Sequence, residues 1–194
     1  MRTKRITPEM ITEATIKIVA KEGLENFSAK KTATKLDISE GTIYNNFPNK
    51  KSVLAGCMYS IDKELDAILQ AVPRPQSFKE YTKYLWVAYF DYFMENPNKA
   101  LFYQQFRTSN YYDEEVSKGQ RKSFTFITQF LIENMKYIKI KDPMIFWAHY
   151  VSGTLNFVCY YIKTNQIPTR EDIQTIMQLM YEGIFSVFSE EISN

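Results

Sequence analysis

The chain has 194 residues, 45% of them hydrophobic and 24% charged, which is enough for a sizeable core in one domain or two small ones. The longest apolar run, about residues 84–90, is well short of the roughly 18 residues of a membrane span, and the basic amino terminus lacks a hydrophobic signal segment. We therefore expect a cytoplasmic protein that makes no contact with a membrane.

The two cysteines and the single histidine argue against a metal centre. Cys57 and Cys159 lie far apart and form no CxxC pair, so buried free thiols are expected rather than a disulfide scaffold or a zinc site. His149 stands without a cluster of cysteines or carboxylates; we expect a satisfied or surface histidine, with a donor in a ligand pocket as the alternative. The sequence thus predicts no metal and no cofactor.

The net charge of +2 is unevenly distributed along the chain. Residues 1–51 hold ten Lys and Arg and six Asp and Glu, a net charge of +4, whereas residues 52–194 carry −2. A basic excess at one end favours contact between that end and nucleic acid. Arg2, Lys4 and Arg5 form a short basic arm that could reach a DNA groove, although a disordered terminus is the commoner role of such a segment.

A first helix is predicted from Thr7, as the capping residue, to about Gly23, with Pro8 at its opening position. Residues 28–51 then predict a helix-turn-helix followed by the start of a longer helix. Ser28, Ser39 and Asn49 are residues whose side chains accept a hydrogen bond from free amides at a helix start, and each precedes spaced apolar residues. Asp37 lies in the tight turn, where a left-handed backbone is expected.

The second helix of this motif has an inner and an outer face. Ile43 and Phe47 lie four residues apart and are expected to face inward. The residues left on the outside or at the helix ends, and so available to touch DNA, are Glu40, Gly41, Thr42, Tyr44, Asn45 and Asn46.

Lysines stand in the first turn of two of these helices. Lys30 and Lys31 follow Ser28, and Lys50 and Lys51 follow Asn49, where positive charge opposes the helix dipole. An anion bound at each helix start would reverse that penalty, so free amides and adjacent lysines together suit a DNA phosphate. Solvated surface lysines that are tolerated at small cost are the equally ordinary alternative.

Residues 39–50, which read Ser-Glu-Gly-Thr-Ile-Tyr-Asn-Asn-Phe-Pro-Asn-Lys, resemble the signature of the TetR family of bacterial transcriptional repressors, and residues 7–65 are similar to its whole DNA-binding domain. The resemblance implies an all-α homodimer with an N-terminal three-helix helix-turn-helix DNA-binding domain and a larger C-terminal helical domain, about nine helices in all. The larger domain would dimerise and usually bind a small effector. Asp37 in place of the usual turn glycine and Thr32 in place of a usual apolar residue depart from the family pattern.

By position, the resemblance implies phosphate contacts from Thr42, Tyr44 and Lys50, and the remaining outer residues of the second helix would lie nearest the bases. With the helix starts included, the expected DNA-binding residues are Ser28, Lys30, Ser39, Glu40, Gly41, Thr42, Tyr44, Asn45, Asn46 and Lys50.

A long helix over residues 50–71 is predicted to link the two parts of the chain. Residues 71–76, Ala-Val-Pro-Arg-Pro-Gln, cannot continue it, because proline lacks the amide hydrogen and disfavours helix in the residue before it. We therefore expect a DNA-binding domain over residues 1–51 and an effector-binding and dimerisation domain over residues 72–194. Caps and prolines predict helices in the second part over residues 77–96, 98–108, 113–137 and 143–164, and from Thr169 onward.

The last two predicted helices carry apolar stripes that suit a four-helix interface with their two-fold mates. Ordinary core within one chain would give the same stripes, and the family resemblance favours the dimer. The expected interface residues are Val151, Leu155, Val158, Ile162, Ile176, Met180 and Ile184.

The second domain is the aromatic part of the chain, since 26 of the 30 Phe, Trp and Tyr residues follow residue 77. This bias favours an apolar, planar or long-chain effector, although aromatic residues at helical spacing are more often core than pocket. The candidate pocket residues are Tyr89, Phe93, Phe106, Phe130, Trp147 and Tyr150.

An enzyme is not expected, because the sequence has no glycine-rich phosphate loop, nucleophile elbow, HExxH motif or convincing pair of carboxylates. A helical adaptor that binds another protein without sequence-specific DNA binding is the alternative, since Tyr and Phe are also interface residues. The lysines at paired helix starts favour the main hypothesis. That hypothesis is a TetR-type regulator: a homodimeric repressor on a palindromic operator in double-stranded DNA, released by a small apolar or aromatic effector.

Overall fold

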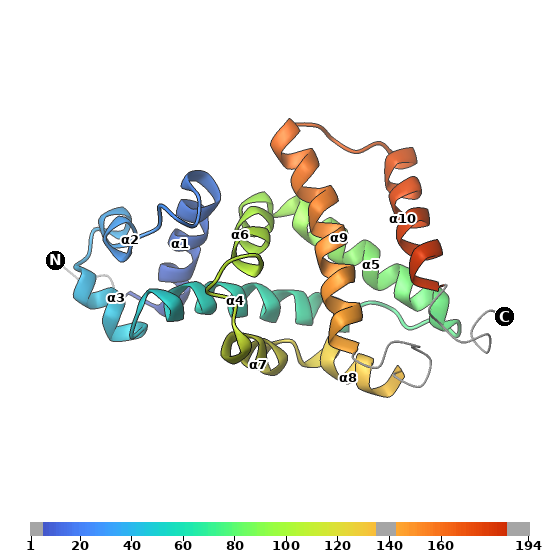
Figure 1. The fold of residues 1–194 in the computed structure, drawn as a ribbon, viewed down its shortest axis with the longest axis horizontal. Helices are drawn as coiled ribbons and strands as arrows, with labels where there is room; N and C mark the ends of the chain where they lie inside the picture. The colour runs from blue at the N-terminus through green and yellow to red at the C-terminus, as the bar shows by residue number, and fades with distance from the viewer. Residues whose placement is uncertain (1–5, 135–142, 186–194) are drawn as a thin grey trace. The chain divides into compact units, whose positions relative to one another are not determined.

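The computed structural model describes residues 6–134 and 143–185 (Figure 1). These residues form ten α-helices and no strand, which confirms the prediction of an all-α protein. None of the described helices is long and apolar enough to cross a lipid bilayer. In chain order the helices are α1 (Pro8–Glu22), α2 (Ala29–Leu36), α3 (Glu40–Asn46), α4 (Lys50–Gln70), α5 (Phe78–Glu95), α6 (Pro97–Arg107), α7 (Glu114–Ser123), α8 (Thr125–Asn134), α9 (Pro143–Thr164) and α10 (Arg170–Phe185).

The first three helices begin where their capping residues predict. The side chain of Thr7 accepts a hydrogen bond from the Met10 amide at the start of α1, and Gly23 ends that helix with a φ of +90°. Ser28 and Ser39 cap α2 and α3 in the same way. Each cap satisfies an amide that has no partner within its own helix, so local chemistry fixes where these short helices start.

Both departures from the family pattern are accommodated within the helix-turn-helix. Asp37 adopts the left-handed conformation, with φ 56° and ψ 52°, so an aspartate takes up the turn geometry that usually calls for glycine. Thr32 is fully buried, and its hydroxyl lies 3.0 Å from that of Thr15 on α1. The buried hydroxyl is therefore satisfied by a hydrogen bond between α1 and α2.

The chain divides into two compact units that do not follow the chain in order. Unit 1 consists of Met1–Glu64 and Asn98–Phe124, and unit 2 of Leu65–Pro97 and Thr125–Asn194. The helix-turn-helix thus shares a unit with most of α4 and with α6 and α7. The functional boundary predicted at residue 72 stays a prediction.

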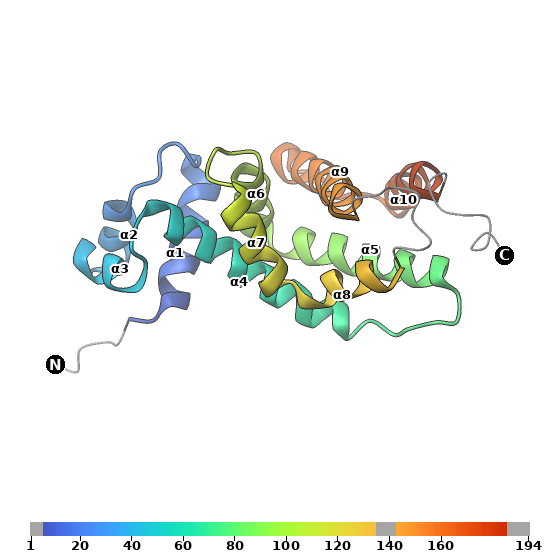
Figure 2. The same cartoon turned by 60° about the horizontal axis from the view of Figure 1, so that its bottom comes forward.

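Within unit 1, α6 and α7 are joined to the helix-turn-helix and α4 by hydrogen bonds. The Tyr59 hydroxyl on α4 donates to the Val116 carbonyl on α7 over 3.2 Å, and Figure 2 shows α7 crossing α4. The side chain of Gln105 on α6 accepts a 2.9 Å hydrogen bond from the Leu24 amide, just after α1. Segments about 60 to 80 residues apart in sequence therefore fix one another in place.

A buried carboxylate on α4 is the centre of a second set of contacts in unit 1. Asp62 is fully buried and accepts hydrogen bonds from the Tyr103 hydroxyl on α6 and the Gln120 amide on α7. The Gln120 amide also donates to the Tyr103 hydroxyl over 2.7 Å. Three helices thus converge on one buried carboxylate, through hydrogen bonds to its Oδ1 atom.

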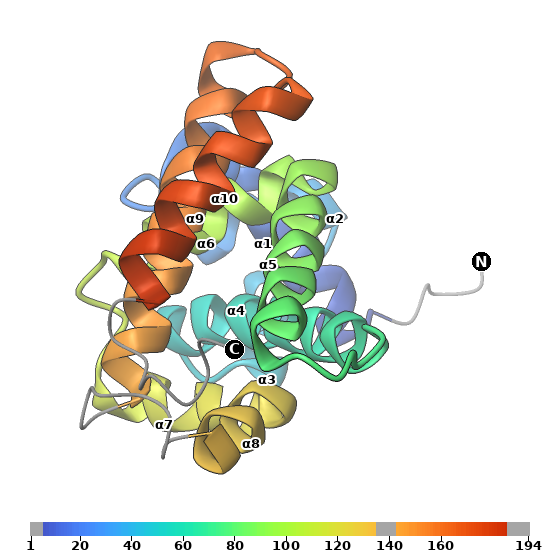
Figure 3. The same ribbon diagram turned by 90° about the vertical axis from the view of Figure 1, so that its right-hand side faces the viewer.

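Unit 2 is built on α5, α9 and α10. The indole of Trp86 on α5 is fully buried and donates a 2.8 Å hydrogen bond to the Thr154 hydroxyl on α9. The helices α9 and α10 lie side by side and run in opposite directions (Figure 3). They approach closely at Gly153, where a Cβ atom would lie 3.1 Å from the sulfur of Met180.

The prediction of one helix over residues 113–137 is wrong, because the structure has two helices with a break at Phe124. Phe124 leaves the helical conformation, with φ −112° and ψ 64°, whereas Gly119 remains inside α7. The cause is a long-range cap: the carboxylate of Asp66 on α4 accepts hydrogen bonds from the Phe126 amide at 2.7 Å and the Thr125 hydroxyl at 2.8 Å. These contacts start a new helix, α8.

Candidate DNA-binding site

The candidate recognition helix α3 packs against the core with one face and exposes its other face to solvent. Ile43 is fully buried, and Phe47 at the end of the helix packs against α4, where a Cβ added to Gly56 would lie 2.6 Å from its ring. Tyr44 is 44% exposed although it is a large aromatic residue. An exposed aromatic side chain on a short helix with a fixed inner face is available to a partner.

Every predicted DNA-contact residue is at least partly exposed. Thr42 and Lys50 are half-buried and the rest are exposed. The Asn46 amide donates a 2.9 Å hydrogen bond to the Thr42 carbonyl of its own helix, and a base edge would have to replace or share that contact. The exposed members of the predicted set are Ser28, Lys30, Ser39, Glu40, Gly41, Tyr44, Asn45 and Asn46.

The cap of α4 also forms as the sequence predicts. The Asn49 side chain accepts a 2.9 Å hydrogen bond from the Ser52 amide, and the Ser52 hydroxyl accepts one from the Asn49 amide at 3.0 Å. This reciprocal pair leaves other amides of the first turn of α4 beside Lys50 and Lys51, which is the arrangement expected for a phosphate site.

The four lysines at helix starts have different surroundings. Lys30 is exposed on α2, whereas its neighbour Lys31 forms a 2.7 Å ion pair with Glu22 at the end of α1. The Lys50 ammonium lies 5.6 Å from the ring centre of Phe27 and 5.5 Å from that of Tyr111. These distances are typical of cation–π contacts.

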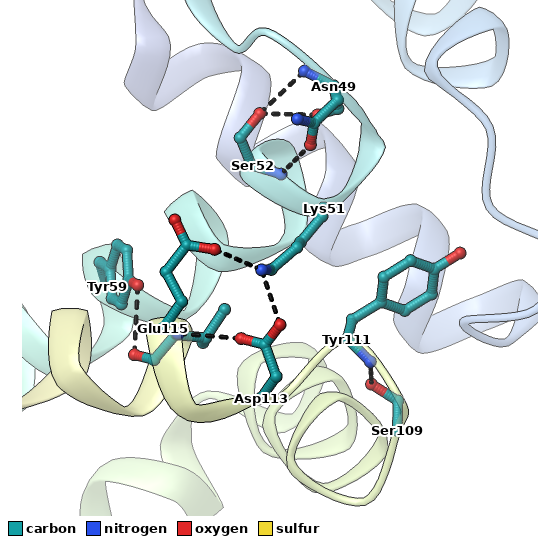
Figure 4. A network of polar contacts seen from close by, with 9 residues as sticks. Asn49, Lys51, Ser52, Tyr59, Ser109, Tyr111, Asp113 and Glu115 are labelled. Atoms are coloured by element: carbon teal, nitrogen blue, oxygen red, sulfur yellow. Dashed lines mark hydrogen bonds and ion pairs between the residues drawn. The ribbon is translucent and has the colours of Figure 1, made fainter.

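Lys51 is bound by two carboxylates from the start of α7 (Figure 4). Its ammonium lies 2.7 Å from Asp113 and 2.6 Å from Glu115. Hydrogen bonds to these carboxylates raise the pKa of Lys51, and the hydrogen bond from Lys51 holds the pKa of Asp113 below its usual range. No local pattern predicts these partners, because they lie more than 60 residues away in the sequence.

The described members of the predicted effector pocket are buried or half-buried. Tyr89, Phe93 and Phe106 are buried core side chains, and Phe106 belongs to unit 1 whereas the other two belong to unit 2. Phe130 is half-buried, stacked on Phe78 with ring centres 5.6 Å apart. The side chains of Trp147, Tyr150 and His149 fall outside the described residues.

Unit 2 contains an open groove of about 1530 Å³ between α5 and α10. Val87 and Ala88 from α5 and Ile173 and Met177 from α10 are among its apolar lining residues. Its charged lining residues are the basic Lys79, Lys83 and Arg170 and the acidic Glu80 and Asp91. A lining that combines apolar side chains with charged ones suits an amphipathic ligand.

The predicted dimer residues have mixed surroundings within the chain. Leu155, Val158 and Ile176 are already buried in the single chain, whereas Ile162 and Met180 are half-buried. Tyr160 on α9 and Leu179 on α10 are large apolar residues with 56% and 63% of their surface exposed. The side chains of Val151 and Ile184 fall outside the described residues.

The described residues offer neither a reactive thiol nor a cluster of metal ligands. Cys57 and Cys159 are buried free thiols, as the sequence predicts. Burial raises the pKa of Cys57 strongly and that of Cys159 to about 11, so both thiols stay protonated at neutral pH. The described residues contain no group of three or more His, Cys, Asp or Glu placed to hold a metal ion.

Comparison with known proteins agrees with this geometry. The model of the family described as bacterial regulatory proteins, tetR family, matches residues 11–57, which run from α1 into α4. A search of curated protein sequences found no match.

Solved structures of transcription regulators share the fold over nearly the whole chain. A tetR family regulator from Shewanella sp. PV-4 is 18% identical with a TM-score of 0.78, over 95% of this chain and 98% of that one. A TetR family regulator from Marinobacter aquaeolei VT8 is 17% identical with a TM-score of 0.74, over 91% and 94%. FadR from Bacillus subtilis, solved in complex with stearoyl-CoA, is 18% identical with a TM-score of 0.67, over 94% and 100%.

The family and fold matches are to regulators rather than to enzymes, and they confirm the expectation raised by residues 39–50. Residues 11–57 thus match the DNA-binding domain of the tetR family of bacterial regulatory proteins, and the chain as a whole shares the fold of the solved regulators of that family.

Proposed function

We propose that the protein is a homodimeric repressor that acts in the cytoplasm on an approximately palindromic operator in double-stranded DNA. The observation that carries this proposal is the exposed outer face of α3, with lysines at the starts of α2 and α4 on either side of it in the sequence. Phosphate contacts at those helix starts would position α3 in the major groove. Two heads related by two-fold symmetry would then read two half-sites about one helical turn, or a multiple of it, apart.

The test is selection of bound fragments from sheared genomic DNA, followed by sequencing and by measurement of the size of the complex. An inverted repeat bound by two or four subunits is expected. Failure to enrich any sequence at low and at moderate salt would contradict the proposal. The helical adaptor, which binds another protein instead of DNA, would then be the better hypothesis.

Asn46 is proposed to read a base. Replacement of Asn46 by Ala should change the preferred base at one position of each half-site, with a loss of about 1–3 kcal/mol if the contact is bidentate. Repeating the selection with the variant measures this. A binding motif identical to that of the unmodified protein would show that Asn46 makes no base contact.

We also propose that the dimer forms through α9 and α10. Tyr160 and Leu179 offer exposed apolar surface for this contact, while the buried Leu155, Val158 and Ile176 would support the two helices from inside the chain. Leu179→Glu should therefore give a monomer in light scattering. Ile132→Glu on α8 is the matched control, because Ile132 is 59% exposed and lies outside the proposed interface. A dimer that survives Leu179→Glu but dissociates with Ile132→Glu would contradict this assignment.

The effector is proposed to be a long-chain amphipathic anion that binds in the groove between α5 and α10. The apolar lining of the groove and its three basic side chains, against two acidic ones, support this class, and the FadR structure from Bacillus subtilis contains stearoyl-CoA. Titration calorimetry with stearoyl-CoA, with coenzyme A alone as the control, tests the class. Ala88→Trp should block binding, since Ala88 lines the groove.

Binding of the effector should weaken operator binding, and linkage requires the operator to weaken effector binding by the same factor. Calorimetry of stearoyl-CoA with and without operator measures both directions. An effector affinity that the operator leaves unchanged would contradict this coupling.

A further inference from the structure

Two adjacent lysines begin α4, and their ammonium groups have different partners. Lys50 lies against the faces of Phe27 and Tyr111, with ring distances of 5.6 and 5.5 Å. A ring face attracts the cation without accepting its three N–H groups as a carboxylate does, so Lys50 can still donate to an anion. Its half-exposed position keeps it within reach of DNA.

Lys51 already has two anionic partners. Asp113 and Glu115 lie 2.7 and 2.6 Å from its ammonium. Two of its three N–H groups therefore donate to carboxylates, in the kind of contact that a phosphate oxygen would otherwise make.

One of the two carboxylates, that of Asp113, is held in place by a contact that does not involve Lys51. Asp113 caps α7 by accepting a 3.1 Å hydrogen bond from the Val116 amide. The Val116 carbonyl in turn accepts a hydrogen bond from Tyr59 on α4, two turns after Lys51 (Figure 4). The start of α7 is thus fixed on α4, and Lys51 meets an Asp113 carboxylate whose position is also set by the cap of α7.

We propose that the segment from Tyr111 to Glu115 assigns different roles to the two lysines: Lys50 is presented to the DNA backbone, and Lys51 is withheld from it by Asp113 and Glu115. These carboxylates are positioning residues that limit this part of the protein to one phosphate contact per subunit. The inference rests on the proposed DNA-binding function.

Salt dependence of DNA binding measures the number of phosphate contacts directly, since each contact contributes about 0.9 to the slope of log K against log salt on duplex DNA. The probes are the selected operator and a mixed-sequence DNA duplex. Lys50→Ala should lower the slope by about 0.9 per subunit, and Lys51→Ala should leave it unchanged. Loss of an equal slope with Lys51→Ala would overturn the proposal.

The carboxylates are tested by Asp113→Asn combined with Glu115→Gln. Asparagine retains the capping oxygen of Asp113, and glutamine retains the shape of Glu115, so α7 should still form. The released Lys51 should raise the slope by about 0.9 per subunit, and adding Lys51→Ala to this variant should remove the gain. An unchanged slope in the double variant would contradict the proposal.

Two controls separate the possible failures. Circular dichroism melting of each variant identifies loss of the fold, and Glu115→Gln alone, which leaves the cap untouched, should still raise the slope if the double variant does not fold. If the unmodified protein binds neither probe, the DNA-binding function itself fails. If it binds but Lys50→Ala and Lys51→Ala behave alike, only the assignment of different roles fails.

Discussion

Both units of the chain combine hydrogen bonds between distant segments with stacked aromatic rings, which in unit 1 include those of Phe102 and Phe106. In unit 1, directional hydrogen bonds join distant segments, as between the Leu24 amide and Gln105 and between Tyr59 and the Val116 carbonyl. In unit 2, aromatic rings form much of the described core, and Phe130 stacks on Phe78 with centres 5.6 Å apart. Unit 2 also has directional contacts, such as the bond from Trp86 to Thr154, so the difference is one of emphasis.

This difference suits the two tasks proposed for the units. A hydrogen bond weakens steeply when its distance or angle changes, so a set of them fixes α3 and α4 in one arrangement. Apolar contacts have no such direction, and cores tolerate repacking when volume is conserved. Unit 1 is therefore suited to present a fixed surface to DNA, and unit 2 to adjust around a ligand.

The largest effect is expected from Asp62→Ala, which removes the acceptor shared by Tyr103 and Gln120. Two buried polar groups would lose a partner, and we expect a loss of about 3 kcal/mol in the free energy of unfolding. Urea denaturation measures this loss. Asp62→Asn keeps an acceptor for the Tyr103 hydroxyl and should cost clearly less. Equal losses for the two variants would mean that packing, not hydrogen bonding, holds α4, α6 and α7 together.

Alanine substitutions at one glycine in each unit compare how well the two units accommodate an added methyl group. An alanine at Gly56 would place its Cβ 2.6 Å from the Phe47 ring at the end of α3, whereas one at Gly153 would meet the flexible end of Met180 at 3.1 Å. We expect Gly56→Ala to cost about 2 kcal/mol and to weaken operator binding. Gly153→Ala should be neutral or stabilising, because alanine favours a helix over glycine by about 1 kcal/mol.

Thermal melting and operator titration of the two glycine variants measure these effects. A Gly56→Ala variant with undiminished operator affinity would show that α3 adjusts without cost, against the fixed arrangement inferred for unit 1.

The smallest effect is expected from two helix caps. Ser28→Ala removes the cap of α2 and Ser77→Ala that of α5, and each should cost about 1 kcal/mol. Only Ser28→Ala should also weaken DNA binding, since α2 begins beside a proposed phosphate contact. Melting curves and binding to a mixed-sequence duplex separate the two effects. Equal loss of DNA affinity in both variants would point to a general effect of stability.

Local sequence predicts the helix-turn-helix well because its boundaries are set by neighbouring residues. Ser28 and Ser39 cap their helices with their own side chains, and Asp37 takes the left-handed turn. The break at Phe124 could not be predicted in this way, because the capping carboxylate of Asp66 comes from 60 residues away. The contacts of Lys51 with Asp113 have the same origin.

The apolar stripe of α9 illustrates a different limit. Leu155 and Val158 have the spacing expected for either an interface or a core, and the described chain buries both. Periodicity reports that a face is apolar but not which partner covers it. The same holds for the pocket candidates Tyr89 and Phe93, which are buried and whose spacing does not tell core from pocket lining.

The discontinuous make-up of unit 1 bears on the design of chimeric regulators. A fusion that keeps residues 1–71 and takes the rest from a relative would separate Lys51 from Asp113 and Glu115, and Leu24 from Gln105. The helix-turn-helix would then depend on the residues that the relative has at the positions of Asp113, Glu115 and Gln105. A chimera that keeps the DNA-binding part of this chain should therefore include Asn98–Phe124 together with Met1–Glu64.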